Sequence, residues 1–204
     1  MLNYADLDPA KKAFIFELDN VLYPERDYLL QVYYLFANFI EYTEGFPPAA
    51  DLTSFFKTSL DHHGAAGIFD RALAAFALDE KYRRNFGLLH QTARLPLKLL
   101  LYKPMLELLQ EIVVDRKKIF LVTDGDPGQQ LNKIRQIEWH GLEKHLTVYF
   151  TAETNPKPET DVLNMILAQH NILRKELLII GTLKVDEEFA DAAGIDYLDQ
   201  GFLR

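Results

Sequence analysis

The sequence predicts an α/β fold, a doubly wound parallel sheet with a helical module inserted after its first strand. Short apolar runs end in polar residues at three places, within residues 13–19, 118–125 and 177–182. Amphipathic helical patterns lie between these runs, and strands that alternate with helices indicate parallel β-α-β units. Because ligands of such sheets bind beyond the C-terminal strand ends, we expect the polar ends to face one crevice.

Each predicted element has its own signal in the sequence. The three runs are short enough and apolar enough to be buried strands, and residues 146–150 and 195–198 are weaker candidates. Met105, Leu108, Leu109 and Ile112 recur at the spacing of one helix face, and so do Leu163, Ile166, Leu167 and His170. Pro127 and Pro158 stand where first-turn prolines of helices are expected.

The alternation of strands and helices is interrupted between residues 23 and 97, where the chain is aromatic and helical in pattern. Glycines and prolines at 45–48 and 64–67 separate the helical stretches. The expected domains are therefore an α/β core, residues 1–22 and 98–204, and an inserted helical domain, residues 23–97.

Composition excludes several classes of function. The 204 residues contain no cysteine, which excludes disulfides, thiolate zinc sites, iron–sulfur clusters and a cysteine nucleophile. The net charge of −8 argues against nucleic acid as a partner. No run reaches the roughly 18 apolar residues of a membrane span, and residues 1–10 lack the pattern of a secretory signal. We expect a cytoplasmic protein that has no membrane partner.

Polar residues suited to phosphoryl transfer stand at or near the predicted strand ends. Glu17 and Asp19 leave the first strand two residues apart, so that one carboxylate could bind a cation while the other handles a proton. Thr123 and Lys157 offer a hydroxyl and an ammonium that can hold phosphate oxygens. Asp186 adds a further carboxylate. Together these residues are the components of a metal-assisted phosphoryl-transfer site.

The order of these residues resembles that of the haloacid dehalogenase (HAD) superfamily, in its phosphatase branch with a helical cap. Residues 14–24 resemble the family's first motif, DxDxT or DxDxV, and residues 121–127 the second, whose Thr or Ser binds phosphate. Lys157-Pro158 resembles the third motif, and residues 179–195 the acidic fourth motif with its Ala-Ala-Gly. The resemblance implies a Rossmann-like core, an inserted cap and Mg²⁺ as a cofactor. The implied substrate is a small phosphorylated metabolite or nucleotide.

The resemblance also implies a role for each matching residue. It implies catalysis by Glu17 and Asp19, metal binding by Glu17, Asp19 and Asp186, and phosphate binding by Thr123, Asp124 and Lys157.

Two positions depart from the family pattern. Glu17 stands where the family has its nucleophilic aspartate, and Thr182 stands where the family has a metal-binding acid. The extra methylene of glutamate moves its oxygens by about 1 Å, a misplacement that can cost on the order of 100-fold in rate. A threonine hydroxyl in place of a carboxylate removes a full charge from the metal site, which is therefore weakened.

A site without its metal would leave three carboxylates close together. Glu17, Asp19 and Asp186 would repel a phosphate dianion if Lys157 were their only cation. One hypothesis is that Lys184 reaches into the site and neutralises them, against the simpler expectation of a solvent-exposed lysine.

Some of these residues have a simpler structural interpretation. Asp124 and Asp126 suit a turn and a helix N-cap before Pro127. Asp186 suits the N-cap of the last helix equally well. The basic run at 116–118 is typical of a solvated surface.

Two functions therefore stay open. The first is a magnesium-dependent phosphatase that uses Glu17 as its nucleophile. The second is a catalytically weakened or silent relative that binds a phosphorylated ligand or a protein partner, and the changes at Glu17 and Thr182 favour it slightly. Dehalogenase chemistry fits less well, because the resemblance implies that dehalogenases lack the second acid that Asp19 supplies.

Overall fold

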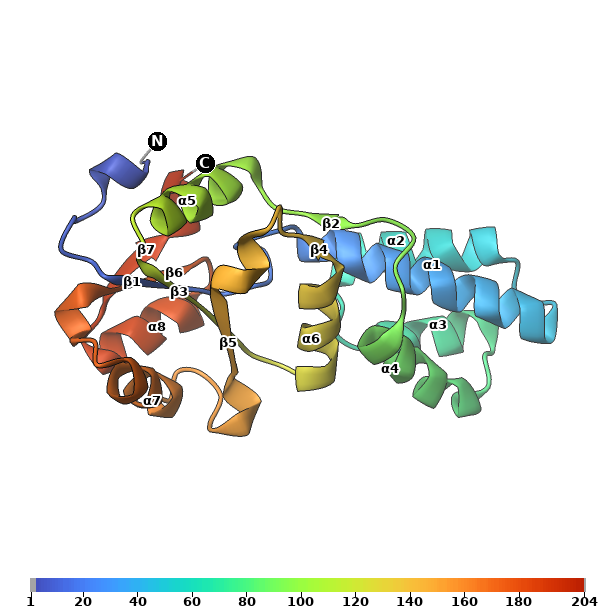
Figure 1. Cartoon of the computed structure of the whole chain (residues 1–204). Coiled ribbons are helices and arrows are strands. Elements are labelled where there is room, and N and C mark those ends of the chain that lie inside the picture. Colours follow the sequence, from blue (N-terminus) through green and yellow to red (C-terminus); the bar gives the residue numbers. More distant parts are fainter. Residues whose placement is uncertain (1–2, 204) are drawn as a thin grey trace. The chain divides into compact units, whose positions relative to one another are not determined.

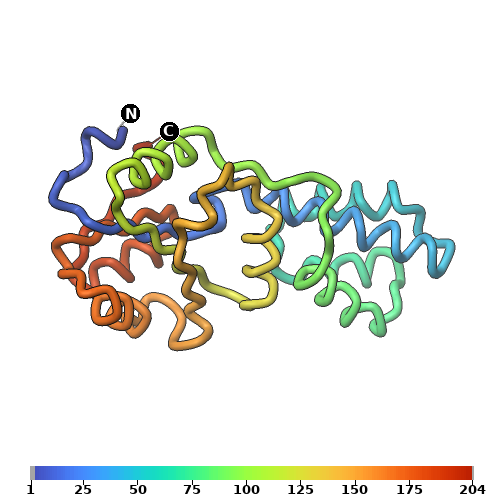
Figure 2. Tube along the Cα trace, in the orientation of Figure 1, coloured from blue at the N-terminus to red at the C-terminus, as the bar shows by residue number. Residues whose placement is uncertain are grey.

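The computed structural model describes residues 3–203, so the predictions for residues 1, 2 and 204 lie outside the described residues. Contacts divide the chain into two compact units. Unit 1 contains the chain up to Pro24, Leu100–Gln130 and the residues from Ile137 onward, and unit 2 contains Glu25–Leu99 with Leu131–Gln136. The colours of Figure 2 show that unit 1 collects both ends of the chain, whereas unit 2 is mostly one inserted stretch.

Unit 1 is built on a five-stranded parallel sheet of order β5-β3-β1-β6-β7. Its strands are β1 (Ala13–Phe16), β3 (Lys118–Thr123), β5 (Leu146–Phe150), β6 (Leu177–Gly181) and β7 (Asp196–Asp199). The α/β fold class is confirmed. The three strong strand signals give β1, β3 and β6, which lie side by side in the middle of the sheet, while the two weaker signals give the edge strands.

Helices cover both faces of this sheet, with α5 on one side and α7 and α8 on the other (Figure 1). The helices and short strands of this part of the chain are β2 (Leu99–Leu100), α5 (Lys103–Val114), α6 (Pro127–Gln136), β4 (Ile137–Glu138), α7 (Asp161–His170) and α8 (Lys184–Ala193). The single turns of 3₁₀-helix are η1 (Tyr4–Asp6), η3 (Leu142–His145), η4 (Thr151–Glu153), η5 (Arg174–Glu176) and η6 (Gln200–Leu203).

The predicted helix faces are the buried ones. Met105, Leu108, Leu109 and Ile112 of α5 are all buried. Leu163 and Ile166 of α7 pack with Phe189 of α8 against Ile15 and Ile179 of the sheet. Pro127 opens α6 as predicted, but Pro158 does not open a helix, because α7 begins only at Asp161.

Unit 2 is helical, as its aromatic sequence predicts. It contains α1 (Glu25–Glu44), α2 (Ala49–His63), α3 (Ile68–Phe76), the 3₁₀ turn η2 (Glu80–Tyr82) and α4 (Arg83–Thr92). Stacked and edge-on rings form its core: the Phe36 and Phe86 centroids are 5.0 Å apart, and those of Tyr33 and Phe56 are 4.9 Å apart.

The second half of α6 belongs to unit 2, although the sequence places it in the predicted core domain. The Asn132 amide donates to the backbone carbonyls of His90 and Ala93 at 3.2 and 3.1 Å, and the buried Lys133 ammonium lies 2.9 Å from Glu25. Such polar contacts leave no trace in hydrophobic periodicity, which is why the sequence did not assign these residues to the helical unit.

Between residues 3 and 203, no helix combines the length and the apolar character needed to cross a membrane.

His90 is a buried titratable group of unit 2. Its ring is 9% exposed and lies 4.9 Å from the Phe86 ring, and its Nδ1 has no hydrogen-bond partner among the described residues. Burial, assisted by the Lys133 charge, lowers the pKa of His90 to about 4. The folded state therefore holds this imidazole neutral.

We expect unit 2 to lose stability as the pH falls from 6.5, the ordinary pKa of histidine, to about 4. Over this range the histidine is protonated in the unfolded chain but stays neutral in the folded protein. This difference lowers the free energy of unfolding by up to about 3 kcal/mol. His90→Phe should flatten this dependence in urea unfolding measured by circular dichroism at pH 7 and pH 5. His63→Phe, at an exposed position of α2, is the control and should leave the dependence unchanged. Equal acid sensitivity in His90→Phe and wild type would contradict the assignment.

Candidate active site

The polar ends of the three central strands lie at one edge of the unit 1 sheet. In the parallel register, Phe16 of β1 pairs with Leu121 of β3 and with Ile180 of β6. Glu17, the next residue, therefore leaves the sheet beside the C-terminal ends of both neighbours, which are Thr123 and Gly181. The strand register brings these positions together, as the sequence predicts.

The Glu17 carboxylate is buried, and its own surroundings occupy both of its oxygens. Oε1 accepts hydrogen bonds from the backbone N–H of Leu18 at 2.8 Å and from the Thr123 hydroxyl at 2.6 Å. Oε2 accepts from the Lys157 ammonium. The extra methylene of glutamate lets the carboxylate fold back over the N–H of its own neighbour while it still reaches Lys157.

The Lys157 ammonium lies between two carboxylates. It pairs with Glu17 Oε2 and, at 2.8 Å, with Asp186 Oδ1, and it lies 5.5 Å from the centroid of the Phe189 ring. The side chain is only 3% exposed. This lysine links the end of β1 and the start of α8 to the segment that follows β5.

Asp186 lies in the first turn of the helix that follows β6. Its Oδ2 accepts the backbone N–H groups of Thr182 and Leu183 at 3.2 and 3.1 Å, which ties the strand end to the first turn of α8. Gly181 makes room for this carboxylate, because a Cβ there would lie 2.4 Å from the Asp186 Cβ. The N-cap position itself belongs to Leu183, so the predicted N-cap role of Asp186 is wrong. Asp186 is the N3 residue, which bonds back to the Leu183 N–H and also holds Lys157.

Asp19 turns away from this cluster. Its Oδ1 accepts from the Tyr23 hydroxyl at 2.8 Å and its Oδ2 from the Gln130 amide at 3.0 Å. The same amide donates to the Asp124 carbonyl at 2.6 Å. The carboxylate expected to handle a proton therefore accepts hydrogen bonds from two neutral donors of the core unit.

The two aspartates after β3 serve the local backbone. Asp126 is the N-cap of α6 and accepts from the Gln129 N–H at 2.8 Å, as predicted. Asp124 accepts from the Thr151 hydroxyl and, at 3.3 Å, from the backbone N–H of Lys157. It thereby fixes the segment that carries the lysine.

The neutralising role proposed for Lys184 is wrong. Its side chain is 85% exposed and pairs with Glu188 at 3.1 Å, one turn along α8. Lys157 supplies the neutralising charge instead. Spacing along the chain places Lys184 nearer to Thr182, but the first turn of α8 directs its side chain to solvent.

Protonation in this cluster follows from its burial. Burial raises the pKa of the Glu17 carboxyl, although the Lys157 charge and the donated hydrogen bonds act in the opposite direction. Burial alone would lower the pKa of Lys157, but Glu17 and Asp186 overcome it and hold that pKa above its ordinary value. Lys157 is therefore an ammonium at neutral pH.

Comparison with known proteins identifies the family. A model of the haloacid dehalogenase-like hydrolases matches residues 14–199, a stretch that includes all the strand ends described above. The chain belongs to the haloacid dehalogenase-like hydrolase family. No curated protein sequence matches the chain significantly.

Solved structures of this family share the fold. A provisionally assigned β-phosphoglucomutase from Thermotoga maritima is 19% identical with a TM-score of 0.61, over 90% of this chain and 82% of that one. A provisionally assigned HAD hydrolase, YfnB from Bacillus subtilis bound to magnesium, is 16% identical with a TM-score of 0.59, over 92% and 85%. A provisionally assigned phosphoglycolate phosphatase from Lactobacillus plantarum is 17% identical with a TM-score of 0.56, over 95% and 87%. These identities establish a common fold alone.

The residues of this HAD-family site do not fit the divalent cation that the family implies. Among residues 3–203, no group of three or more His, Asp or Glu side chains is arranged to hold a metal ion. Each carboxylate oxygen of Glu17 and Asp186 already accepts a hydrogen bond from the protein. An ammonium occupies the space between the two carboxylates, and Thr182 offers no third one. Mg²⁺ would require at least one of these bonds to break.

We expect Lys157→Met to destabilise the HAD core by about 3–5 kcal/mol, because it leaves two carboxylates buried without their cation. Urea unfolding followed by circular dichroism measures this loss. Lys184→Met removes an exposed lysine of the same unit and should change the stability by less than about 0.5 kcal/mol. Unchanged stability in Lys157→Met would mean that water, rather than the lysine, solvates the two carboxylates.

Proposed function

We propose that this chain is a HAD-fold protein of phosphomonoesterase ancestry in which phosphatase turnover is lost. One observation carries the proposal: the donors of the site are bonded to the acceptors of the same site. The Leu18 N–H, the Thr123 hydroxyl and the Lys157 ammonium all donate to Glu17, and Lys157 also donates to Asp186. Of these, Glu17 is the residue that the family resemblance implies for the nucleophile, and Thr123 and Lys157 are residues that it implies for the phosphate.

Three physical arguments support the loss of turnover. Three accepted hydrogen bonds fill most of the roughly four lone-pair sites of the Glu17 carboxylate and stabilise its charge, which weakens it as a nucleophile. The Lys157 ammonium already pairs with the carboxylates of Glu17 and Asp186, so a divalent cation would have to displace it. Finally, these two carboxylates against one ammonium leave a negative site, which repels a phosphate dianion.

The names of two fold relatives support a proposal for the class of the ancestral substrate. The Thermotoga maritima and Lactobacillus plantarum proteins are named for a phosphoglucose and for phosphoglycolate, both small phosphorylated metabolites. We propose the same substrate class for the ancestor of this chain. The present protein would keep the scaffold for binding a ligand or a protein partner.

The test is hydrolysis of an aryl phosphate with and without Mg²⁺. We expect the wild type to stay at the rate of Glu17→Ala under both conditions, since neither variant offers a free carboxylate and a bound metal. Magnesium-dependent turnover that disappears in Glu17→Ala would overturn the proposal. It would establish the alternative, an active phosphatase with a glutamate nucleophile.

A double variant, Glu17→Asp with Thr182→Asp, tests which positions account for the loss. The shorter side chain no longer reaches both the Leu18 N–H and Lys157, and the new carboxylate supplies the missing charge. We expect this variant to bind Mg²⁺ in isothermal titration calorimetry, whereas the wild type does not. Glu17→Asp alone is the matched control and should bind more weakly than the double variant.

A further inference from the structure

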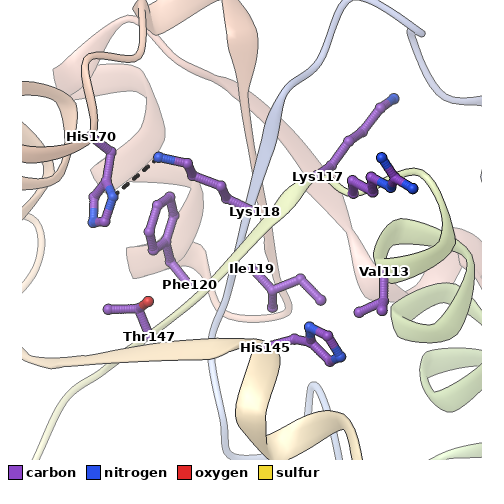
Figure 3. Close-up of a pocket in the computed structure, with 9 residues that line it drawn as sticks. Val113, Lys117, Lys118, Ile119, Phe120, His145, Thr147 and His170 are labelled. Atoms are coloured by element: carbon purple, nitrogen blue, oxygen red, sulfur yellow. Dashed lines mark hydrogen bonds between the residues drawn. The ribbon is translucent and has the colours of Figure 1, made fainter.

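A basic cavity lies at the opposite edge of the unit 1 sheet from the candidate active site (Figure 3). The starts of β3 and β5, the turn after α5 and the end of α7 line a space of about 480 Å³. Its polar lining residues are Arg116, Lys117, Lys118, His145, Thr147 and His170. The family's strand-end residues take no part in it.

The charge of this cavity contrasts with that of the chain. No lining residue is acidic, although the chain has 30 acidic against 22 basic residues. Among residues 3–203, no carboxylate forms an ion pair with the Arg116 guanidinium or the Lys118 ammonium. Lys118 Nζ lies within hydrogen-bond distance, 3.3 Å, of His170 Nδ1, so the side chain that it meets there is an imidazole and not a carboxylate. Figure 3 shows Lys118 and His170 directed toward each other.

The ammonium of Lys117 is directed to partners outside this cavity. Its Nζ lies 3.4 Å from the Pro9 carbonyl and 5.2 Å from the centroid of the Tyr4 ring. Its charge is therefore satisfied elsewhere. The groups free to hold a ligand are the guanidinium of Arg116, the ammonium of Lys118 and the neutral donors beside them.

The backbone at Arg116 gives an independent argument. This residue has a φ of 56° and ends α5, with its N–H donating to the Val113 carbonyl and the next N–H to that of Ile112. Glycine adopts this left-handed conformation without strain and is the usual residue at such a helix end. An arginine here keeps a charged side chain in the lining of the cavity at a conformational cost.

We propose that this cavity binds a small phosphorylated molecule, a phosphate monoester that carries two negative charges. The guanidinium and the ammonium would donate to the phosphate oxygens, together with the Thr147 hydroxyl. Val113 and Ile119, which also line the space, would contact the organic part of the ligand. The volume falls in the usual range for small-molecule sites. This site is separate from the proposed function and does not depend on it.

The experiment titrates the full-length protein with phenyl phosphate, and with phenol as its uncharged counterpart. Histidine ring signals in NMR report the site, with His145 and His170 assigned through His145→Gln and His170→Gln. We expect both signals to shift and saturate with phenyl phosphate but not with phenol.

Arg116→Gly and Lys118→Met identify the binding groups. Each should weaken binding by at least about tenfold, the effect of losing one charge-assisted hydrogen bond. Arg116→Gly suits the left-handed backbone, so its fold is expected to stay intact, which a thermal melt verifies. Lys184→Met, an exposed lysine of the same unit, is the control and should bind as the wild type does.

Three results would overturn the proposal. The first is the absence of saturable shifts at His145 and His170. The second is affinity unchanged in both Arg116→Gly and Lys118→Met. The third is tighter binding of a single-stranded oligonucleotide than of phenyl phosphate through these residues. That result would mean that the cavity is part of a nucleic-acid-binding surface.

Discussion

The ammonium of Lys157 between the carboxylates of Glu17 and Asp186 is the interaction on which the rest of unit 1 depends. The carboxylates of Glu17, just after β1, and Asp186, in the first turn of α8, could not both be buried without a cation, because the desolvation of each costs several kcal/mol. The lysine arrives from the segment after β5 and joins it to β1 and α8, three parts of the chain that are distant in sequence. The ion pair therefore fixes how the loops at this edge of the sheet meet. The same contacts occupy the groups that catalysis would require.

Much of this arrangement could be predicted from the sequence. The strands β1, β3 and β6 are recognisable because each is a short apolar run that turns polar where it leaves the sheet, and the parallel fold places their polar ends at one edge. The helix faces of α5 and α7 are equally plain in the spacing of their apolar residues. The N-cap at Asp126 follows from an acid before a first-turn proline. Each of these features depends on residues that are close together in the chain, so the sequence pattern of that stretch predicts it.

What the sequence could not predict depends on side-chain direction and on strand order. The sequence allows Lys184 as a partner for the acids only as a hypothesis, against the simpler expectation of an exposed lysine, and the direction of its side chain is decided by the first turn of α8. The run at 116–118 has the composition of a solvated surface, and it becomes part of a cavity only because β5 pairs with β3 and brings His145 and Thr147 beside it. The second half of α6 joins unit 2 through hydrogen bonds to the carbonyls of His90 and Ala93, and the spacing of apolar residues does not predict such bonds.

Gly181 has a consequence for attempts to rebuild chemistry on this scaffold. The strand end there has no space for one more carbon atom, because the Asp186 side chain fills the position that a Cβ would take. The space available at Gly181 therefore limits which substitutions this site can accept more strictly than the charge of the new side chain does. The functional groups of the surrounding residues can be exchanged, but the last residue of β6 must remain glycine. A larger residue there would displace the first turn of α8 and, with it, the Asp186 carboxylate that pairs with Lys157.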